Sequence, residues 1–174
     1  MFTITTLRDK PLLQIPAAAI TLGLMWFIPF LVHLIPVNSA VPLGAQLLPI
    51  FYAPLLAAWL FNPFVGIACG LLMPFINYAV TGMPEFNMAV LLGIELSVFS
   101  LMLLVFKRNG TRNAVVAPFS LIVGKIISSL FLLIVPIMPI SPWAYFSSSV
   151  INAFPGLIVL FVINLMLLRL PHER

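Results

Sequence analysis

Long apolar stretches, separated by short groups of proline, glycine and polar residues, run along the whole chain. There is no formally charged residue between Lys10 and Glu85, so turn-forming residues must mark the ends of the elements in that part. The pattern divides the chain into six apolar segments. They lie at about 12–35, 44–61, 64–81, 87–106, 114–137 and 144–168. Each is close to the roughly 20 residues that an α-helix needs to cross a bilayer.

The composition narrows the class of protein. Hydrophobic residues make up 63% of the chain and charged residues 7%, with a mean hydropathy of +1.21, which is far outside the range of soluble domains. We therefore expect an all-α integral membrane protein, with residues 1–174 forming a single bundle of six transmembrane helices. The first apolar segment is long and lacks a small-residue cleavage site, so we expect it to remain in the mature protein.

The basic residues predict how the bundle is oriented. Except for one lysine inside the fifth segment, Lys and Arg lie before the first segment, between the fourth and fifth, and after the sixth. These are Arg8, Lys10, Lys107, Arg108, Arg112, Arg169 and Arg174. The loops at 36–43, 82–86 and 138–143 contain neither residue. Because Lys and Arg are enriched in cytoplasmic loops, we expect both termini to lie in the cytoplasm.

Two charged residues interrupt apolar segments at depth, Glu95 in LLGIELSVF and Lys125 in LIVGKIISS. A charge near the bilayer centre costs on the order of 3 kcal/mol, so each needs a partner or water. At a rise of about 1.5 Å per residue, Glu95 is expected about 12 Å and Lys125 about 18 Å below the external ends of their helices. They are therefore expected to meet, either as a structural ion pair or as a ligand-binding pair.

Other polar residues are weaker candidates for ligand binding. Asn152 is expected about 13 Å below the external start of the sixth segment, where it suits either a ligand or interhelical hydrogen bonding. His33, near the external end of the first segment, is a ligand candidate or an interfacial anchor. Asn77 and Tyr78 follow the helix-disturbing Pro74 and are accessible candidates.

For two external aromatic residues and one cysteine, the sequence favours structural roles. Trp143 and Tyr145 are expected in the aromatic belt at the membrane interface, with stacking on a ligand as the alternative. Cys69 is expected about 18 Å below the external surface, near the level of Lys125. Its neighbours Gly66 and Gly70 form a GxxxG face that suits close helix packing, so the residues alone favour Cys69 as a small apolar side chain.

Several functional classes are disfavoured by the sequence. It lacks HExxH, a Gly-rich phosphate loop, a Walker motif and a carboxylate pair within one segment, so we do not expect an enzyme. The net charge of +4 is not arranged as a basic stripe with aromatic residues, and nucleic acid is not an expected partner. A single cysteine excludes an internal disulfide, and a Cys/His cluster for zinc is missing.

The chain resembles the substrate-binding S-components of energy-coupling factor (ECF) vitamin transporters. The resemblance rests on six short helices, an external loop after the first, and the run LGAQLLPIFYAPLLAAWLFNPFVGIACGLLMPFINYAVTGMPEFN. It implies a ligand held near the external side by that loop and by polar residues of helices four to six. Glu95, Lys125 and Asn152 lie where the resemblance requires them.

Within this family, the single cysteine inside a helix resembles the BtuM-type cobalamin transporters. That resemblance implies a cysteine thiolate as ligand to the cobalt of a bound corrinoid, and Cys69 is the matching residue. A thiolate is a suitable soft ligand for cobalt, and the small neighbours Ala68 and Gly70 leave room for a flat macrocycle. Cobalamin would then be the transported ligand, and the protein would need no cofactor of its own.

One departure from the family pattern concerns the partner. S-components that dock on a shared coupling module carry Ala-x-x-x-Ala in the first helix, whereas this chain has Ala19-x-x-x-Gly23. The altered motif leaves docking on a coupling module open and is compatible with a protein that acts alone.

The sequence thus predicts a multi-pass uptake protein of a bacterial inner (plasma) membrane, with cobalamin as the expected vitamin. One alternative is an S-component for another small polar vitamin that Glu95 and Lys125 grip directly. A second alternative is a membrane scaffold without transport activity, in which the buried polar groups only pair with each other.

Overall fold

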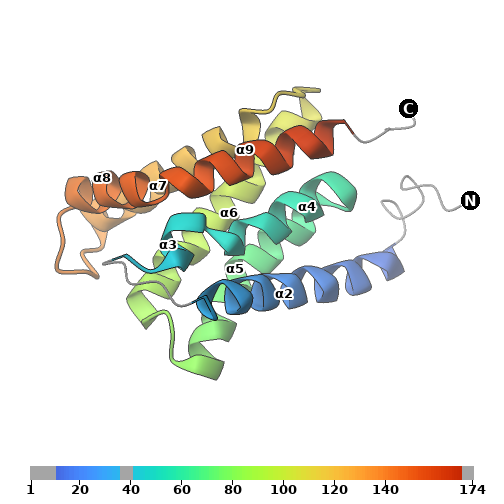
Figure 1. Ribbon diagram of the computed structural model, residues 1–174. Coiled ribbons are helices and arrows are strands. Elements are labelled where there is room, and N and C mark those ends of the chain that lie inside the picture. The colour runs from blue at the N-terminus through green and yellow to red at the C-terminus, as the bar shows by residue number, and fades with distance from the viewer. Residues whose placement is uncertain (1–10, 36–40, 170–174) are drawn as a thin grey trace, which may run out of the picture.

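The computed structural model describes residues 11–35 and 41–169, and all regular elements in these two ranges are helices (Figure 1). The predicted all-helical class is therefore confirmed. The elements are α2 (Pro11–His33), α3 (Leu43–Leu47), the 3₁₀ helix η1 (Pro49–Phe51), α4 (Tyr52–Leu60), α5 (Pro63–Thr81), α6 (Phe86–Arg108), α7 (Val116–Ile134), α8 (Pro142–Asn152) and α9 (Phe154–Leu168).

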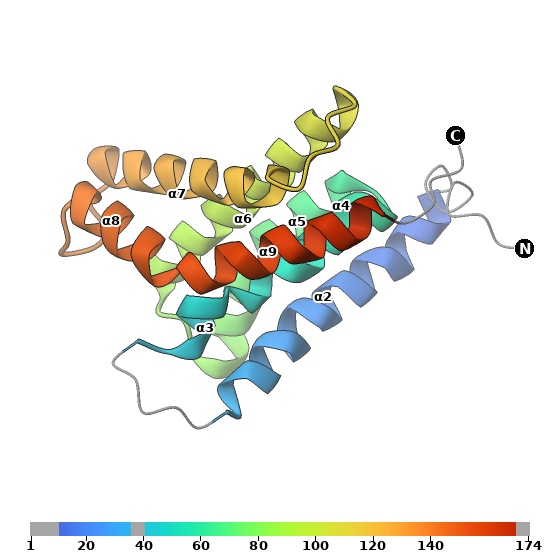
Figure 2. The same ribbon diagram turned by 45° about the horizontal axis from the view of Figure 1, so that its top comes forward.

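The helices form one bundle in which the start of α2 and the end of α9 lie at the same end (Figures 1 and 2). Contacts from basic side chains bring two more helix ends, those of α4 and α6, together there. Lys107, at the end of α6, donates hydrogen bonds to the carbonyls of Ala58 and Trp59 at the end of α4, and Arg112 donates to Leu168 O at the end of α9. The cytoplasmic location of this end stays a prediction.

Four described helices are long and apolar enough to cross a membrane. These stretches are Gln14–His33, Pro63–Thr81, Phe86–Arg108 and Val116–Ile134. A fifth span results if α8 and α9, which are bent by 58°, count as one. This is fewer than the six continuous spans that the apolar segments predict.

The second predicted segment, at about 44–61, is broken near its start. Leu48 has left-handed backbone angles, with φ 55° and ψ 44°, between α3 and η1. Pro49 provides the physical reason, because a proline ring disfavours the right-handed helical conformation in the residue before it. The apolar helix that follows, Pro49–Leu60, is about 18 Å long at 1.5 Å per residue and too short to span a bilayer alone.

The sixth predicted segment, at about 144–168, is bent rather than straight. α8 ends at Asn152, and α9 begins at Phe154 with Pro155 in its first turn. Pro155 has no N–H to continue the hydrogen bonding of α8, and its fixed φ favours the start of a new helix. The bend follows from this one residue inside an otherwise apolar run.

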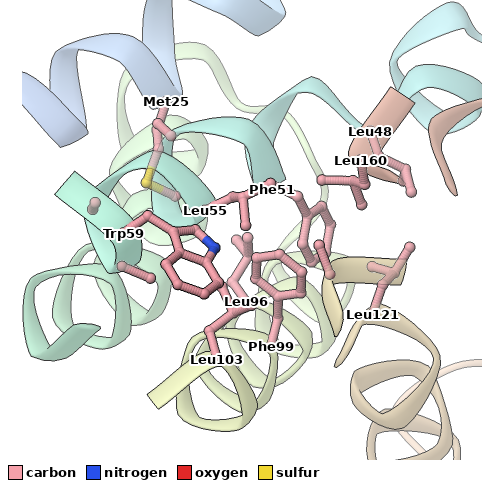
Figure 3. Close-up of a cluster of buried hydrophobic side chains, with 14 of the residues drawn as sticks. Met25, Leu48, Phe51, Leu55, Trp59, Leu96, Phe99, Leu103, Leu121 and Leu160 are labelled. Carbon is pink, nitrogen blue, oxygen red and sulfur yellow. The ribbon is translucent and has the colours of Figure 1, made fainter. Parts of the chain in front are cut away.

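A large apolar cluster joins α2, α4, α5 and α6 with parts of α7 and α9. Figure 3 shows its centre, where Phe51 and Phe99 lie between the α2 residue Met25 and the α7 residue Leu121. The Phe51 and Phe99 rings meet edge to face, with centroids 5.3 Å apart, a favoured aromatic geometry. Burial of these side chains positions α6 against α4 and α5.

Glycines allow α6 to approach both of its neighbours closely. A Cβ added at Gly70 of α5 would lie 2.9 Å from Leu96 Cβ, and one added at Gly124 of α7 would lie 2.9 Å from Glu95 O. The predicted packing face of Gly66 and Gly70 is therefore used, with α6 as its partner. The two contacts also place Cys69, Glu95 and Lys125 at about the same level along the bundle.

We expect Gly124→Ala to destabilise the protein by about 1–3 kcal/mol, because the added methyl group meets a backbone carbonyl and forces α6 and α7 apart. Gly23→Ala is a matched control in α2, since its added Cβ meets nothing within 4 Å. Unfolding of both variants in detergent, followed by tryptophan fluorescence, measures the difference. Equal midpoints for the two variants would contradict the close contact of α6 and α7.

Candidate functional site

The predicted encounter of Glu95 and Lys125 is present. Lys125 Nζ lies 3.3 Å from Glu95 Oε2, and the two side chains are 5% and 1% exposed. Glu95 lies nine residues after the start of α6 and Lys125 nine residues before the end of α7. Each is therefore about 14 Å from its helix end. The depth is more nearly equal than the sequence predicts because α7 ends at Ile134 rather than near 137.

Two hydroxyl groups complete the surroundings of the Glu95 carboxylate. Tyr145 Oη donates to Glu95 Oε1 at 2.9 Å, and Ser128 Oγ donates to the same oxygen at 3.0 Å. Glu95 thus accepts three hydrogen bonds from two neighbouring helices, α7 and α8. We call Glu95, Lys125, Ser128 and Tyr145 the buried polar cluster.

The serines beside Lys125 bond to its backbone. Ser129 Oγ lies 2.7 Å and Ser128 Oγ 3.1 Å from the carbonyl oxygen of Lys125, so both hydroxyls are tied to the turn of α7 that carries the ammonium group. Ser129 thus uses its hydroxyl proton within α7, whereas the single proton of Ser128 is shared between Lys125 O and Glu95 Oε1.

Tyr145 corrects one expectation from the sequence. It was expected in the interfacial aromatic belt, but it is 6% exposed and bonds to Glu95. Trp143, two residues earlier, is 74% exposed, and its place in an aromatic belt stays a prediction. The sequence could not separate the two, because only the rotation of α8 against α7 decides which aromatic side chain faces the bundle.

Other predicted ligand residues are not joined to this cluster by hydrogen bonds in the described part of the chain. Asn152 is half-buried at the end of α8, and Ser148 and Ser149 bond to carbonyls of their own helix. His33 is exposed at the end of α2, where its Nδ1 lies 2.7 Å from Pro29 O. Its ring rests against Gly44 of α3.

Asn77 and Tyr78 lie at the far end of α5 from the basic residues. Tyr78 is exposed, with its ring centroid 5.6 Å from that of Phe86. The backbone carbonyl of Asn77 accepts a hydrogen bond from Thr81. Both contacts are local, because the first joins the end of α5 to the start of α6 and the second lies within α5.

Cys69 shares the level of the buried pair but contacts a different helix. It is 2% exposed within the apolar cluster, and its Sγ lies 3.7 Å from Ala18 O of α2. Within the described residues, no group of three or more His, Cys, Asp or Glu could hold a metal ion. A cobalt ion bound here would therefore have, among the described residues of these types, at most one ligand besides the Cys69 thiolate.

Asn164 is a buried polar residue that was not among the residues predicted from the sequence. Its Nδ2 lies 2.9 Å from Asn113 O and 3.0 Å from Ala114 O, and the residue is fully buried. It fastens the loop between α6 and α7 to α9, near the end that carries the basic residues. Its signal was present in the sequence, as a lone amide in an apolar segment.

Asn164→Ala should destabilise the protein by about 1–3 kcal/mol, because the loop before α7 loses both hydrogen bonds from this fully buried amide to Asn113 O and Ala114 O. Asn109→Ala, at an exposed position at the end of α6, should change the stability by less than about 0.5 kcal/mol. Denaturant unfolding in detergent tests this pair. A neutral result for Asn164→Ala would mean that water replaces the amide without cost.

Comparison of the chain with protein-family models, curated proteins and solved structures finds no match.

Proposed function

We propose that this protein is a membrane uptake protein that binds a small vitamin-like solute at the buried polar cluster. The observation that carries the proposal is the Glu95–Lys125 ion pair, 3.3 Å long and almost fully buried among apolar helices. Charged side chains within such helices are expensive, and they commonly belong to solute pathways. A helix bundle needs no such pair for its stability, because apolar side chains of similar size usually serve as well.

The broken helices support the same proposal. α8, which carries Tyr145, meets α9 at a bend of 58°, and α3 meets η1 at the left-handed Leu48. α3 also contacts α8 and α9. In many transporters the solute site adjoins interrupted helices, because the ends and the unwound backbone of the half-helices offer their dipoles and carbonyl groups to the solute.

The more specific proposal is that the solute is cobalamin and that Cys69 is the ligand to its cobalt. It rests on the sequence resemblance to BtuM-type transporters and on the level that Cys69 shares with the buried pair. Because the thiol is buried against Ala18, cobalt ligation requires α2 to separate from α5 at this point. The proposed location is a bacterial inner membrane, with the protein acting alone or on a coupling module.

Mass spectrometry of small molecules released from the gently purified protein tests this function. A vitamin-like solute is expected, and a corrinoid would also give the sample visible absorption. Uptake of the same radiolabelled vitamin by a transport-deficient strain that expresses the protein should be restored. A protein that releases no solute and restores no uptake would be the non-transporting scaffold instead.

A further inference from the structure

The two charges of the buried pair are unequally supplied with hydrogen bonds. The Glu95 carboxylate accepts from Lys125, Ser128 and Tyr145. The Lys125 ammonium has three N–H donors, and among the residues that the structure describes it donates one hydrogen bond, to Glu95. The Glu95 carboxylate thus has several hydrogen-bond donors, whereas the Lys125 ammonium lacks acceptors, in the ranges that the structure describes, for two of its three N–H groups.

The nearest polar side chains do not remove this inequality. Ser129 donates its hydroxyl proton to Lys125 O, and Ser128 shares its single proton between Lys125 O and Glu95 Oε1. Lys125 itself is 4% exposed. Buried N–H groups without an acceptor are costly, and a group that supplies one gains the free energy of a charge-assisted hydrogen bond.

We propose that the buried polar cluster selects solutes that present an uncharged carbonyl acceptor, such as an amide, to the Lys125 ammonium. This inference rests on the proposed function, in which the cluster binds the solute. A cationic group would have to displace Tyr145 or Ser128 from the carboxylate. A carboxylate would satisfy Lys125 but would add a second negative charge beside Glu95 in a low-dielectric interior, where like charges repel strongly.

Three probes of similar size separate these cases, because they share a pyridine ring and differ in one substituent. Nicotinamide offers an uncharged carbonyl, nicotinate a carboxylate and 3-picolylamine an ammonium group. Binding to the full chain purified in detergent is measured by tryptophan fluorescence and by the shift of the unfolding midpoint. We expect nicotinamide to bind about tenfold more tightly than either charged probe.

Variants of Glu95 and Lys125 should change the order of the probe affinities in a predictable way. In Glu95→Gln the ammonium loses its counter-charge, so the order should reverse and nicotinate should bind about tenfold more tightly than nicotinamide. In the double variant Glu95→Gln/Lys125→Met both preferences should disappear. Ser129→Ala, which changes a neighbouring hydroxyl but neither charge, should keep the wild-type order. If Glu95→Gln does not fold, the wild-type order and the double variant still decide the question.

The inference is overturned if 3-picolylamine binds best, if the order is the same in wild type and Glu95→Gln, or if wild type binds none of the probes. Its failure is distinguishable from that of the proposed function. A solute that co-purifies and is taken up, with no probe preference dependent on Lys125, removes the inference alone. A nicotinamide preference without any co-purified solute or uptake removes the uptake function and leaves the selectivity of the cluster.

Discussion

Glu95→Gln should destabilise the protein by about 3–5 kcal/mol, because it leaves the Lys125 ammonium buried without a counter-charge. Lys125→Met should cost at least about 1 kcal/mol less. The stranded Glu95 carboxylate keeps the hydrogen bonds from Tyr145 and Ser128, and bonds to a charged group contribute about 1.5–3 kcal/mol each. Unfolding in detergent at one pH, with solute-free protein, measures both values.

The double variant decides whether the two charges interact directly. Glu95→Gln together with Lys125→Met should be more stable than Glu95→Gln alone, because no charge is then stranded. Glu85→Gln is the matched control, since Glu85 is exposed at the start of α6, and it should change the stability by less than about 0.5 kcal/mol. Direct pairing is wrong if the double variant is no more stable than the worse single variant.

Cys69→Ser should abolish or shift the visible spectrum of bound cobalamin and weaken its binding by about tenfold or more, if the thiolate is the ligand to cobalt. A hydroxyl group is a poor substitute for a thiolate at a soft metal site. The folded state should persist, because serine has nearly the volume of cysteine and its hydroxyl can bond to Ala18 O. Titration of purified protein with hydroxocobalamin, followed by absorption, gives both readouts.

Cys69→Ala controls for the loss of packing in this experiment. It removes the sulfur from the apolar cluster without adding a polar group, and its effect on the unfolding midpoint reports the packing role. Identical affinity and identical spectra for wild type and Cys69→Ser would mean that Cys69 is not a ligand to cobalt and only packs between α2 and α5.

The sequence was sufficient to find the buried pair. Glu95 and Lys125 are charged residues within apolar segments, and their distance from the helix ends can be counted along the chain. The same counting placed Cys69 at their level. The depth of a residue can be predicted from the sequence because the rise of a helix per residue is constant.

The rotation of each helix about its own axis could not be predicted from the sequence in the same way. Tyr145 faces Glu95 and Cys69 faces α2, and both directions depend on how neighbouring helices pack. The breaks at Leu48 and before Pro155 had a readable signal in the prolines that cause them, but the apolar pattern continues across both positions. Periodicity and hydropathy respond to apolar character, whereas a break depends on one backbone N–H or one steric clash.

The contact between α3 and α9 has a consequence for biogenesis. A Cβ at Gly156 would lie 2.8 Å from the carbonyl oxygens of Gln46 and Leu47, so the start of α9 closes directly over the end of α3. Synthesis proceeds from the N-terminus, and the ribosome has made α2 to α8 before Gly156 emerges. The second apolar segment is therefore made before its final neighbour, and it acquires its mature surroundings only when the last helix has been synthesised.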